Sequence, residues 1–263
     1  MGKTIVLGDV HGRNIWKDIV NDNYDADCFV FLGDYVSTHD YRYADPDIQI
    51  DNLKDILDFA EFENAMTPGR VILLRGNHDM QHLGYHWAEC SGINWHVQDA
   101  MMKMRERFIN NTQWVYVEDN IVYSHAGISE RWMQDNKLTD VNQINDLEPS
   151  EKFGFTPCKL SDYCGDSVTQ PPTWIRPWAL FGNAFGDYTY IVGHTTEPHI
   201  TFMKDASMKQ YKESYFDDMF PPDPNVIKQI EESNEIIVCD CLGSGEYLIV
   251  ENEQFTIGKV EEL

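Results

Sequence analysis

The sequence predicts an α/β fold with a largely parallel sheet at its core, because three strand–turn–helix units follow one another near its start. Each unit begins with a short apolar run, at residues 3–7, 28–32 and 70–75, and each run ends in glycine followed by polar residues. Amphipathic helical patterns, with apolar side chains on one face, occupy residues 15–20 and 48–62. Because parallel strands end at the same edge of an open sheet, these polar residues are expected to meet there.

The residues after each strand carry side chains that could bind an ion or take part in catalysis. Asp9 and His11 lie two apart, so an extended segment would point both side chains the same way, and the glycines beside them let the backbone approach an ion or phosphate. Asp34 follows the second strand. Residues 76–79, Gly-Asn-His-Asp, follow the third and offer an amide oxygen, a group that titrates near neutral pH and a carboxylate.

The middle of the chain predicts more helix and then a hairpin. Residues 80–110 have a mostly helical pattern with an interruption near 90–92. Residues 114–117 and 121–124 are expected strands, and the Asp-Asn pair in the turn at 118–120 is typical of a tight hairpin. The second of these strands ends in His125, followed by alanine and glycine.

The rest of the chain contains two long segments that do not follow a regular pattern. The first, 149–173, is an irregular proline-containing loop, and the second, 197–234, is a polar excursion. We expect one domain over residues 1–263, with both segments shaping the substrate groove. The other expected elements are helices 128–136, 141–147 and 225–233, and strands 188–192, 235–239, 245–250 and 254–260.

Composition disfavours several classes of partner. The 263 residues include 20 basic and 44 acidic side chains, a net charge of −24, which disfavours long nucleic acids and anionic membranes but suits divalent cations. The six cysteines lack the paired spacing of a zinc site, so reduced intracellular thiols are expected. An early first strand leaves no room for a signal peptide, and no run approaches 18 apolar residues. We therefore expect a soluble cytoplasmic protein.

Six potential metal ligands stand at the strand ends. They are Asp9, His11, Asp34, Asn77, His125 and His194. Mixed carboxylate, imidazole and amide donors suit Mn²⁺, Fe or Zn²⁺ better than Ca²⁺ or a thiolate-bound metal. Six donors are too many for one tetrahedral ion but suit two ions that share a carboxylate, and Asp34 is the expected bridge.

Five motifs in this order resemble the calcineurin-like metallophosphoesterase superfamily. They are GDVHG (8–12), GDYV (33–36), LLRGNHD (73–79), HAG (125–127) and GHT (193–195). The closest-looking branch is the lambda-type phosphoprotein phosphatases of phages and bacteria. The resemblance implies two mixed β-sheets packed face to face and flanked by helices, with the metals at one edge. It also implies hydrolysis of phosphate monoesters by a water that two divalent cations activate, most suitably Mn²⁺, with Fe or Zn²⁺ as alternatives.

The resemblance also assigns roles to individual residues. The implied ligands are Asp9, His11 and Asp34 for the first metal, and Asp34, Asn77, His125 and His194 for the second. His78 matches the histidine that protonates the leaving oxygen, so His78 and Asp34 are the predicted catalytic residues. Arg176 resembles a phosphate-binding arginine and, with Asn77, is a predicted substrate-binding residue, although a salt-bridged surface arginine is the alternative.

Two departures from the family pattern bear on specificity. Ser37-Thr38 stand where the second motif usually continues with aspartate, which orients the catalytic histidine, and arginine, which holds phosphate. The candidates to compensate are Asp79, His39, Asp40 and Arg42. Thr196 stands where many phosphodiesterases of the superfamily have a second histidine, which favours the monoesterase branch.

The sequence therefore predicts a metal-dependent phosphomonoesterase most like a Ser/Thr protein phosphatase, acting on a phosphoprotein or a small phosphate ester. Three alternatives remain open. The first is a hydrolase of nucleotides or dinucleoside polyphosphates, the second is a phosphodiesterase, and the third is a catalytically silent metal-binding scaffold.

Overall fold

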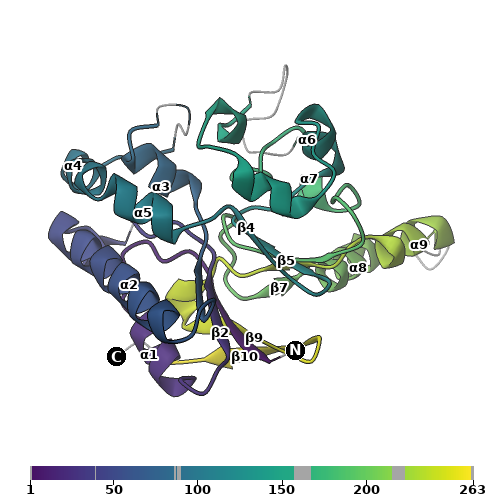
Figure 1. Ribbon diagram of the computed structural model, residues 1–263. Helices are drawn as coiled ribbons and strands as arrows, with labels where there is room; N and C mark the ends of the chain where they lie inside the picture. Colours follow the sequence, from purple (N-terminus) through teal and green to yellow (C-terminus); the bar gives the residue numbers. More distant parts are fainter. Residues whose placement is uncertain are drawn as a thin grey trace.

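The computed structural model describes residues 2–38, 40–85, 87, 90–156, 167–214 and 223–261, and Figure 1 shows their arrangement. Two five-stranded mixed sheets form the centre of the protein, and helices cover them. The expected pair of mixed sheets flanked by helices is confirmed.

The first sheet contains the three strands of the predicted strand–turn–helix units. Strands β1 (Lys3–Leu7), β2 (Cys28–Phe31) and β3 (Val71–Leu73) run parallel, as expected. Strand β9 (Glu246–Glu251) pairs antiparallel with β1, and β10 (Gln254–Lys259) pairs antiparallel with β9. The order β10-β9-β1-β2-β3 places the first strand of the chain in the middle of the sheet.

The second sheet begins with the predicted hairpin. Strands β4 (Val115–Glu118) and β5 (Ile121–Ser124) are antiparallel. Strands β6 (Thr189–Val192) and β8 (Ile236–Val238) continue the sheet parallel to β5, and β7 (Thr201–Phe202) closes it antiparallel to β8. The order is β4-β5-β6-β8-β7.

The inner faces of the two sheets pack on each other and make one apolar cluster. Its members from the first sheet include Val6, Val30 and Leu248, and those from the second include Tyr123, Ile191 and Ile237. Neighbouring residues on the same strands, such as Ile5 and Phe29, belong to the larger cluster under the helices. Because both faces of these strands are buried, their sequences are continuously apolar instead of alternating.

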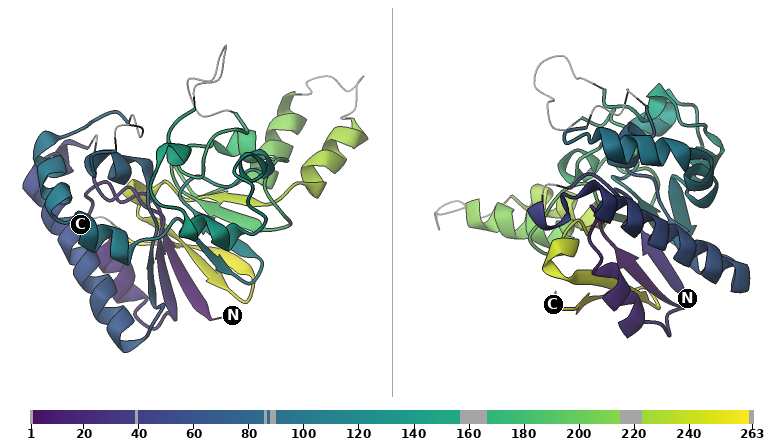
Figure 2. Two further views of the ribbon diagram at one scale, coloured as in Figure 1. Left: turned by 45° about the horizontal axis from the view of Figure 1, so that its top comes forward. Right: turned by 90° about the vertical axis from the view of Figure 1, so that its left-hand side faces the viewer.

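Helices cover the outer faces and the loops above them. On the side of the first sheet they are α1 (Trp16–Asp22), α2 (Pro46–Met66), α3 (Asn77–His82), α4 (Trp95–Lys103) and α5 (Arg105–Asn111). Those of the later chain are α6 (Glu130–Asp135), α7 (Pro177–Leu180), α8 (Met203–Ser214) and α9 (Pro224–Glu232). Short 3₁₀ helices are η1 (Tyr41–Tyr43), η3 (Val141–Asp146), η4 (Glu151–Phe153) and η5 (Leu242–Ser244). Both views in Figure 2 show α8 and α9 extending away from the body of the sandwich.

The largest differences from the sequence-based expectation lie in the second half. The excursion 197–234 contains β7 and α8 as well as the expected helix, because a two-residue strand and a polar helix give little hydrophobic periodicity. Residues 141–147, expected as a helix, form η3, a 3₁₀ helix. Part of the 149–173 loop, residues 157–166, lies outside the described residues. Within the described part of the chain, no helix is both long and apolar enough to cross a membrane.

Candidate metal centre and active site

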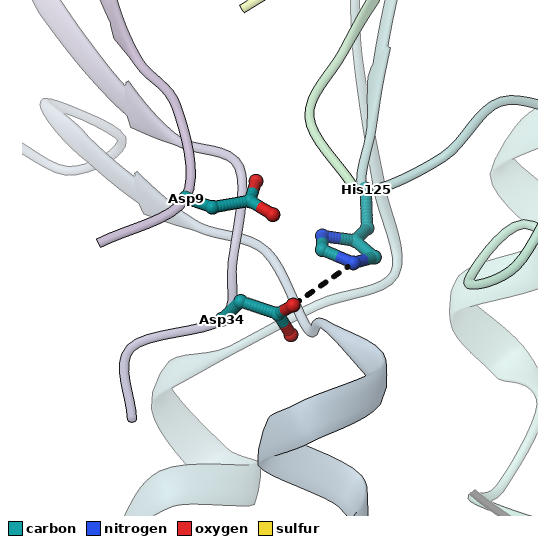
Figure 3. Close-up of side chains that lie close together, drawn as sticks. All are labelled: Asp9, Asp34 and His125. Atoms are coloured by element: carbon teal, nitrogen blue, oxygen red, sulfur yellow. Dashed lines mark ion pairs between the residues drawn. The ribbon is translucent and has the colours of Figure 1, made fainter. Parts of the chain in front are cut away.

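The strand ends of both sheets meet around one cavity of about 210 Å³. Five of the six predicted ligands line it, and so do His78 and Arg176. The sixth ligand, His125, lies directly behind, and its ring faces Asp34 (Figure 3). The sequence-based expectation that these residues lie close together therefore agrees with the geometry.

Four of the predicted ligands direct their donor atoms at one another. The Nε2 atom of His125 lies 2.8 Å from Oδ1 of Asn77 and 3.5 Å from Oδ2 of Asp34. The Nδ1 atom of His194 lies 3.2 Å from the same Asn77 oxygen. These four side chains come from the ends of β2, β3, β5 and β6, so both sheets build the group.

The hydrogen-bond partners show that two of these potential metal-binding atoms, Nε2 of His125 and Oδ1 of Asn77, carry no hydrogen. Nδ1 of His125 is 2.9 Å from the carbonyl oxygen of Leu32, which can only accept, so the ring proton is on Nδ1. Burial lowers the pKa of His125 to about 3, so the ring is neutral and Nε2 presents a lone pair. The amide nitrogen of Asn77 donates to Sγ of Cys90 at 3.1 Å, which turns Oδ1 toward His125.

Lone pairs that face each other without a shared proton repel, and a cation between them removes the repulsion. The donor set of Asp34, Asn77, His125 and His194 therefore fits a divalent metal ion of the kind bound by imidazole and oxygen ligands. The Leu32 carbonyl on His125 is the type of outer partner that fixes the orientation of a metal-binding imidazole.

A second group of donors shares Asp34 with the first. Asp9, Asp34 and His125 each offer one atom, and these atoms lie within 4.8 Å of one another (Figure 3). Nε2 of His11 is 3.9 Å from Oδ2 of Asp9, and Nδ1 of His11 is 3.2 Å from the carbonyl oxygen of Val36. His125 as well as Asp34 therefore belongs to both groups, and His11 lies beside Asp9 at the edge of the second.

Burial and the negative charges of neighbouring carboxylates raise the pKa values of Asp9 and Asp34. Burial raises the pKa of Asp9 well above its usual value, and the negative charges of Asp240 and Asp34 raise it further. Burial, followed by the charge of Asp79, likewise raises the pKa of Asp34. Buried carboxylates in this arrangement require positive charge nearby to ionise, which is the condition that bound divalent cations satisfy.

Three of the predicted ligands have a backbone conformation that is rare for residues other than glycine. The φ angles are 48° at His11, 49° at Asp34 and 61° at His194. Such left-handed residues cost about 1–3 kcal/mol each and cluster at functional sites. Close packing adds a further constraint, because a Cβ atom on Gly76 would collide with the Asp34 carboxylate and one on Gly193 with the Asp9 carboxylate.

Asp79 holds the loop of the second motif in place. Its Oδ2 accepts hydrogen bonds from the backbone N–H groups of Asp34 and Gly76, and its Oδ1 accepts one from Tyr35, each at 2.9 Å. Both oxygens are thus engaged by the backbone. Asp79 is one of the four candidates to compensate for the aspartate and arginine of the family pattern, and these bonds engage its carboxylate with the loop backbone.

Two of the other candidates to compensate for the missing residues pair with each other. The Asp40 carboxylate pairs with the Arg42 guanidinium at 2.7 Å, at the start of η1. His39 lies outside the described residues. The hydroxyl oxygen of Ser37, which the sequence treated as a loss relative to the family pattern, lies 2.9 Å from Nδ1 of His78. A serine does not carry the charge that a motif search expects, so only the geometry could reveal this contact.

Arg176 and Asp240 complete the wall of the cavity. Nη1 of Arg176 donates to the carbonyl oxygen of His194 at 2.9 Å and to Oγ1 of Thr195 at 3.1 Å, so the guanidinium is held beside the predicted ligands. Asp240, which follows β8, accepts a hydrogen bond from Oγ1 of Thr196 at 2.8 Å. Asp240 is not among the site residues predicted from the sequence, because none of the five motifs includes it.

Two facing mixed sheets whose strand ends gather aspartates, histidines and an asparagine around a cavity define the class of metal-dependent phosphoesterases. The chain belongs to the calcineurin-like phosphoesterase family, whose sequence model matches residues 2–215. Members of this family hydrolyse phosphoric esters with the help of divalent metals, so the protein is a metal-dependent hydrolase of phosphoric esters. None of the curated protein sequences matches it significantly.

Solved structures with similar folds include phosphatases. A cold-active protein-tyrosine phosphatase from a Shewanella species has a TM-score of 0.57 and 17% identity, covering 98% of this chain and 78% of that one. A protein serine/threonine phosphatase from Saccharomyces cerevisiae has a TM-score of 0.51 and 13% identity, covering 99% of this chain and 80% of that one. At these identities, the likeness is one of fold.

Proposed function

We propose that this phosphoesterase is a phosphomonoesterase with two divalent cations, most suitably Mn²⁺, and that it acts on phosphoproteins in the manner of Ser/Thr protein phosphatases. The observation that carries the proposal is the position of Asp34, which offers an atom within 4.8 Å of donor atoms of both Asp9 and His125. The proposed ligands are Asp9, His11 and Asp34 for one ion, and Asp34, Asn77, His125 and His194 for the other. The phosphatases with similar folds support a phosphoprotein substrate.

The chemistry that two such cations supply when bound is the activation of water as a nucleophile and the polarisation of phosphoryl oxygens. The residues of the chain supply the rest. Oδ1 of Asp34 accepts a hydrogen bond from the backbone N–H of His78 at 3.0 Å, which holds this histidine at the cavity. From there His78 donates a proton to the departing alkoxide. Arg176 neutralises and orients the oxygens of the transferred phosphoryl group.

The charges in the cavity favour a monoester over a diester. Among the described residues that line it, three carboxylates, on Asp9, Asp34 and Asp240, face one guanidinium, on Arg176. Two divalent cations would more than balance these carboxylates and leave a net positive cavity. A positive site of this kind attracts a doubly charged monoester more strongly than a singly charged diester.

The test compares p-nitrophenyl phosphate with bis(p-nitrophenyl) phosphate, using protein stripped with a chelator and then supplied with Mn²⁺. We expect a strong preference for the monoester. A preference for the diester would overturn the phosphomonoesterase proposal in favour of a phosphodiesterase. Turnover of neither ester, with metal bound, would favour the silent scaffold.

Phosphopeptides and nucleotides tested side by side then separate the two remaining substrate classes. We expect faster turnover of phosphopeptides, and faster turnover of nucleotides would overturn the assignment to protein phosphatases.

Asp34→Asn tests the two-metal arrangement directly. If this variant kept normal metal content and turnover, Asp34 would not be shared between two ions.

A further inference from the structure

A buried hydroxyl group contacts the proposed proton donor. Oγ of Ser37 lies 2.9 Å from Nδ1 of His78, and the side chains reach each other from the loop after β2 and the first turn of α3. Ser37 is buried, and this limits the access of water to its side of the contact. The contact is on the ring nitrogen opposite Nε2, which lies 4.0 Å from the Asp34 carboxylate.

The surroundings of the hydroxyl favour one direction of the hydrogen bond. Oγ of Ser37 also lies 3.3 Å from the carbonyl oxygen of Gly92 and 3.5 Å from that of Ser91. Carbonyl oxygens only accept, so the single hydrogen of the hydroxyl is best directed at them. The hydroxyl oxygen then accepts the N–H of His78 Nδ1. The transferable proton of His78 is thereby assigned to Nε2.

The backbone at Ser37 has a conformation that is rare for serine. Its φ angle is 70°, a conformation that glycine adopts without cost and serine does not. The side-chain oxygen Oε1 of Gln49, a buried residue of α2, accepts the backbone N–H of Ser37 at 2.8 Å and holds it there. A strained residue with its hydroxyl on the proton donor is the pattern expected of a preorganised site.

We propose that Ser37 is the positioning residue of His78: its hydroxyl oxygen holds the N–H at Nδ1, orients the ring, and keeps the transferable proton on Nε2. This inference rests on the proposed phosphomonoesterase function. Ser37 acts through His78, so its effect depends on how much the leaving group needs a proton. An alkyl ester releases a basic alkoxide that requires one, whereas p-nitrophenolate is a stable anion that leaves without one.

The experiment measures kcat and KM on phosphoserine and on p-nitrophenyl phosphate for Ser37→Gly, which removes the hydroxyl and accepts the left-handed backbone. We expect kcat on phosphoserine to fall roughly 10–100-fold with little change in KM, and kcat on p-nitrophenyl phosphate to fall less than about threefold. Ser37→Asn should restore part of the loss, because asparagine tolerates this conformation and offers both an acceptor and a donor. Thr38→Ala, which removes the neighbouring hydroxyl, is the control.

Two further measurements test whether the effect passes through His78. In a His78→Ala background, Ser37→Gly should cause no additional loss on phosphoserine, because residues that act as a unit are not additive. In ¹⁵N NMR of the metal-free protein, the neutral His78 ring should carry its proton on Nδ1, and Ser37→Gly should abolish this preference.

Each contrary result has a separate meaning. Equal losses on both esters, or additive losses in the His78→Ala background, with metal content unchanged, would overturn the role of Ser37 and leave the phosphomonoesterase proposal intact. A proton on Nε2 in the neutral wild-type ring would also overturn it. Wild-type protein that hydrolyses neither ester would instead refute the proposed function, and the role of Ser37 with it.

Discussion

The Nε2 atom of His125 lies 2.8 Å from Oδ1 of Asn77, although neither atom carries a hydrogen. The Leu32 carbonyl oxygen accepts the hydrogen bond from Nδ1 of His125, and Sγ of Cys90 accepts one from the amide of Asn77, so lone pairs of Nε2 and Oδ1 face each other. Without a cation this arrangement is repulsive, and with one it is a set of ligands. The metal requirement of the site should therefore appear in the stability of the protein as well as in its activity.

We predict that Mn²⁺ raises the melting temperature of chelator-stripped protein. A ligand at about 100 times its dissociation constant stabilises the folded state by about 2.7 kcal/mol, which corresponds to about 5–10 °C for a chain of this size. Calorimetry with and without Mn²⁺ measures the shift. Asp34→Asn should abolish most of it, whereas His96→Ala, which alters an exposed histidine paired with Asp47, should not. An unchanged melting temperature in wild-type protein would contradict the metal site.

Cys90 should affect metal affinity through the orientation of the Asn77 amide. Cys90→Ala removes the acceptor of the amide hydrogen and lets the amide rotate, so we expect metal affinity to fall about 10–100-fold. Cys90→Ser keeps an acceptor of similar size and should bind metal nearly as well as wild type. Competition with a fluorescent chelator measures both constants. If the two variants lost affinity equally, packing around Cys90 would explain the effect and the hydrogen bond would not.

The sequence predicts the first half of the fold well, because strong local signals define it. Strands 3–7, 28–32 and 70–75 are continuous apolar runs bounded by glycine, and the structure contains β1, β2 and β3 in these ranges. The second half of the fold is harder to predict from the sequence, since β7 pairs only Thr201 and Phe202 with β8. Such a short strand depends on its partner in the sheet and has no periodicity of its own.

The ligand cluster could be predicted because parallel strands end at one edge, which brings residues as distant as Asp9 and His194 together. The contacts behind the ligands could not. The partner of His78 is a neutral serine, and the partner of Asn77 is a cysteine 13 residues later. Neither residue type identifies its partner, and both contacts depend on how the loops above the sheets fold.

Asp79 should contribute to stability independently of catalysis. Its carboxylate accepts three backbone hydrogen bonds, and an asparagine would direct its amide hydrogens at one or two of those donors. We expect Asp79→Asn to lower the free energy of unfolding of the metal-free protein by about 1–3 kcal/mol. Denaturant titration at about pH 8 is suitable, since burial raises the pKa of Asp79 to about 7. Asp135→Asn, on the surface, should change the stability little, and an equal effect of both variants would contradict this role.

Arg176 should determine how strongly the enzyme binds phosphoryl oxygens. The His194 carbonyl and the Thr195 hydroxyl hold one end of its guanidinium at the cavity wall, and a charged hydrogen bond to the substrate is worth about 1.5–3 kcal/mol. We therefore expect Arg176→Ala to lower kcat/KM roughly 10–100-fold and to weaken inhibition by inorganic phosphate to a similar extent. Arg176→Lys should recover only part of this, because an ammonium group cannot keep the protein contacts and reach the substrate at the same time. Arg131→Ala, which removes an exposed arginine paired with Asp135, is the matched control. If Arg176→Ala left phosphate inhibition unchanged while metal content was preserved, Arg176 would support the position of His194 and would not bind substrate.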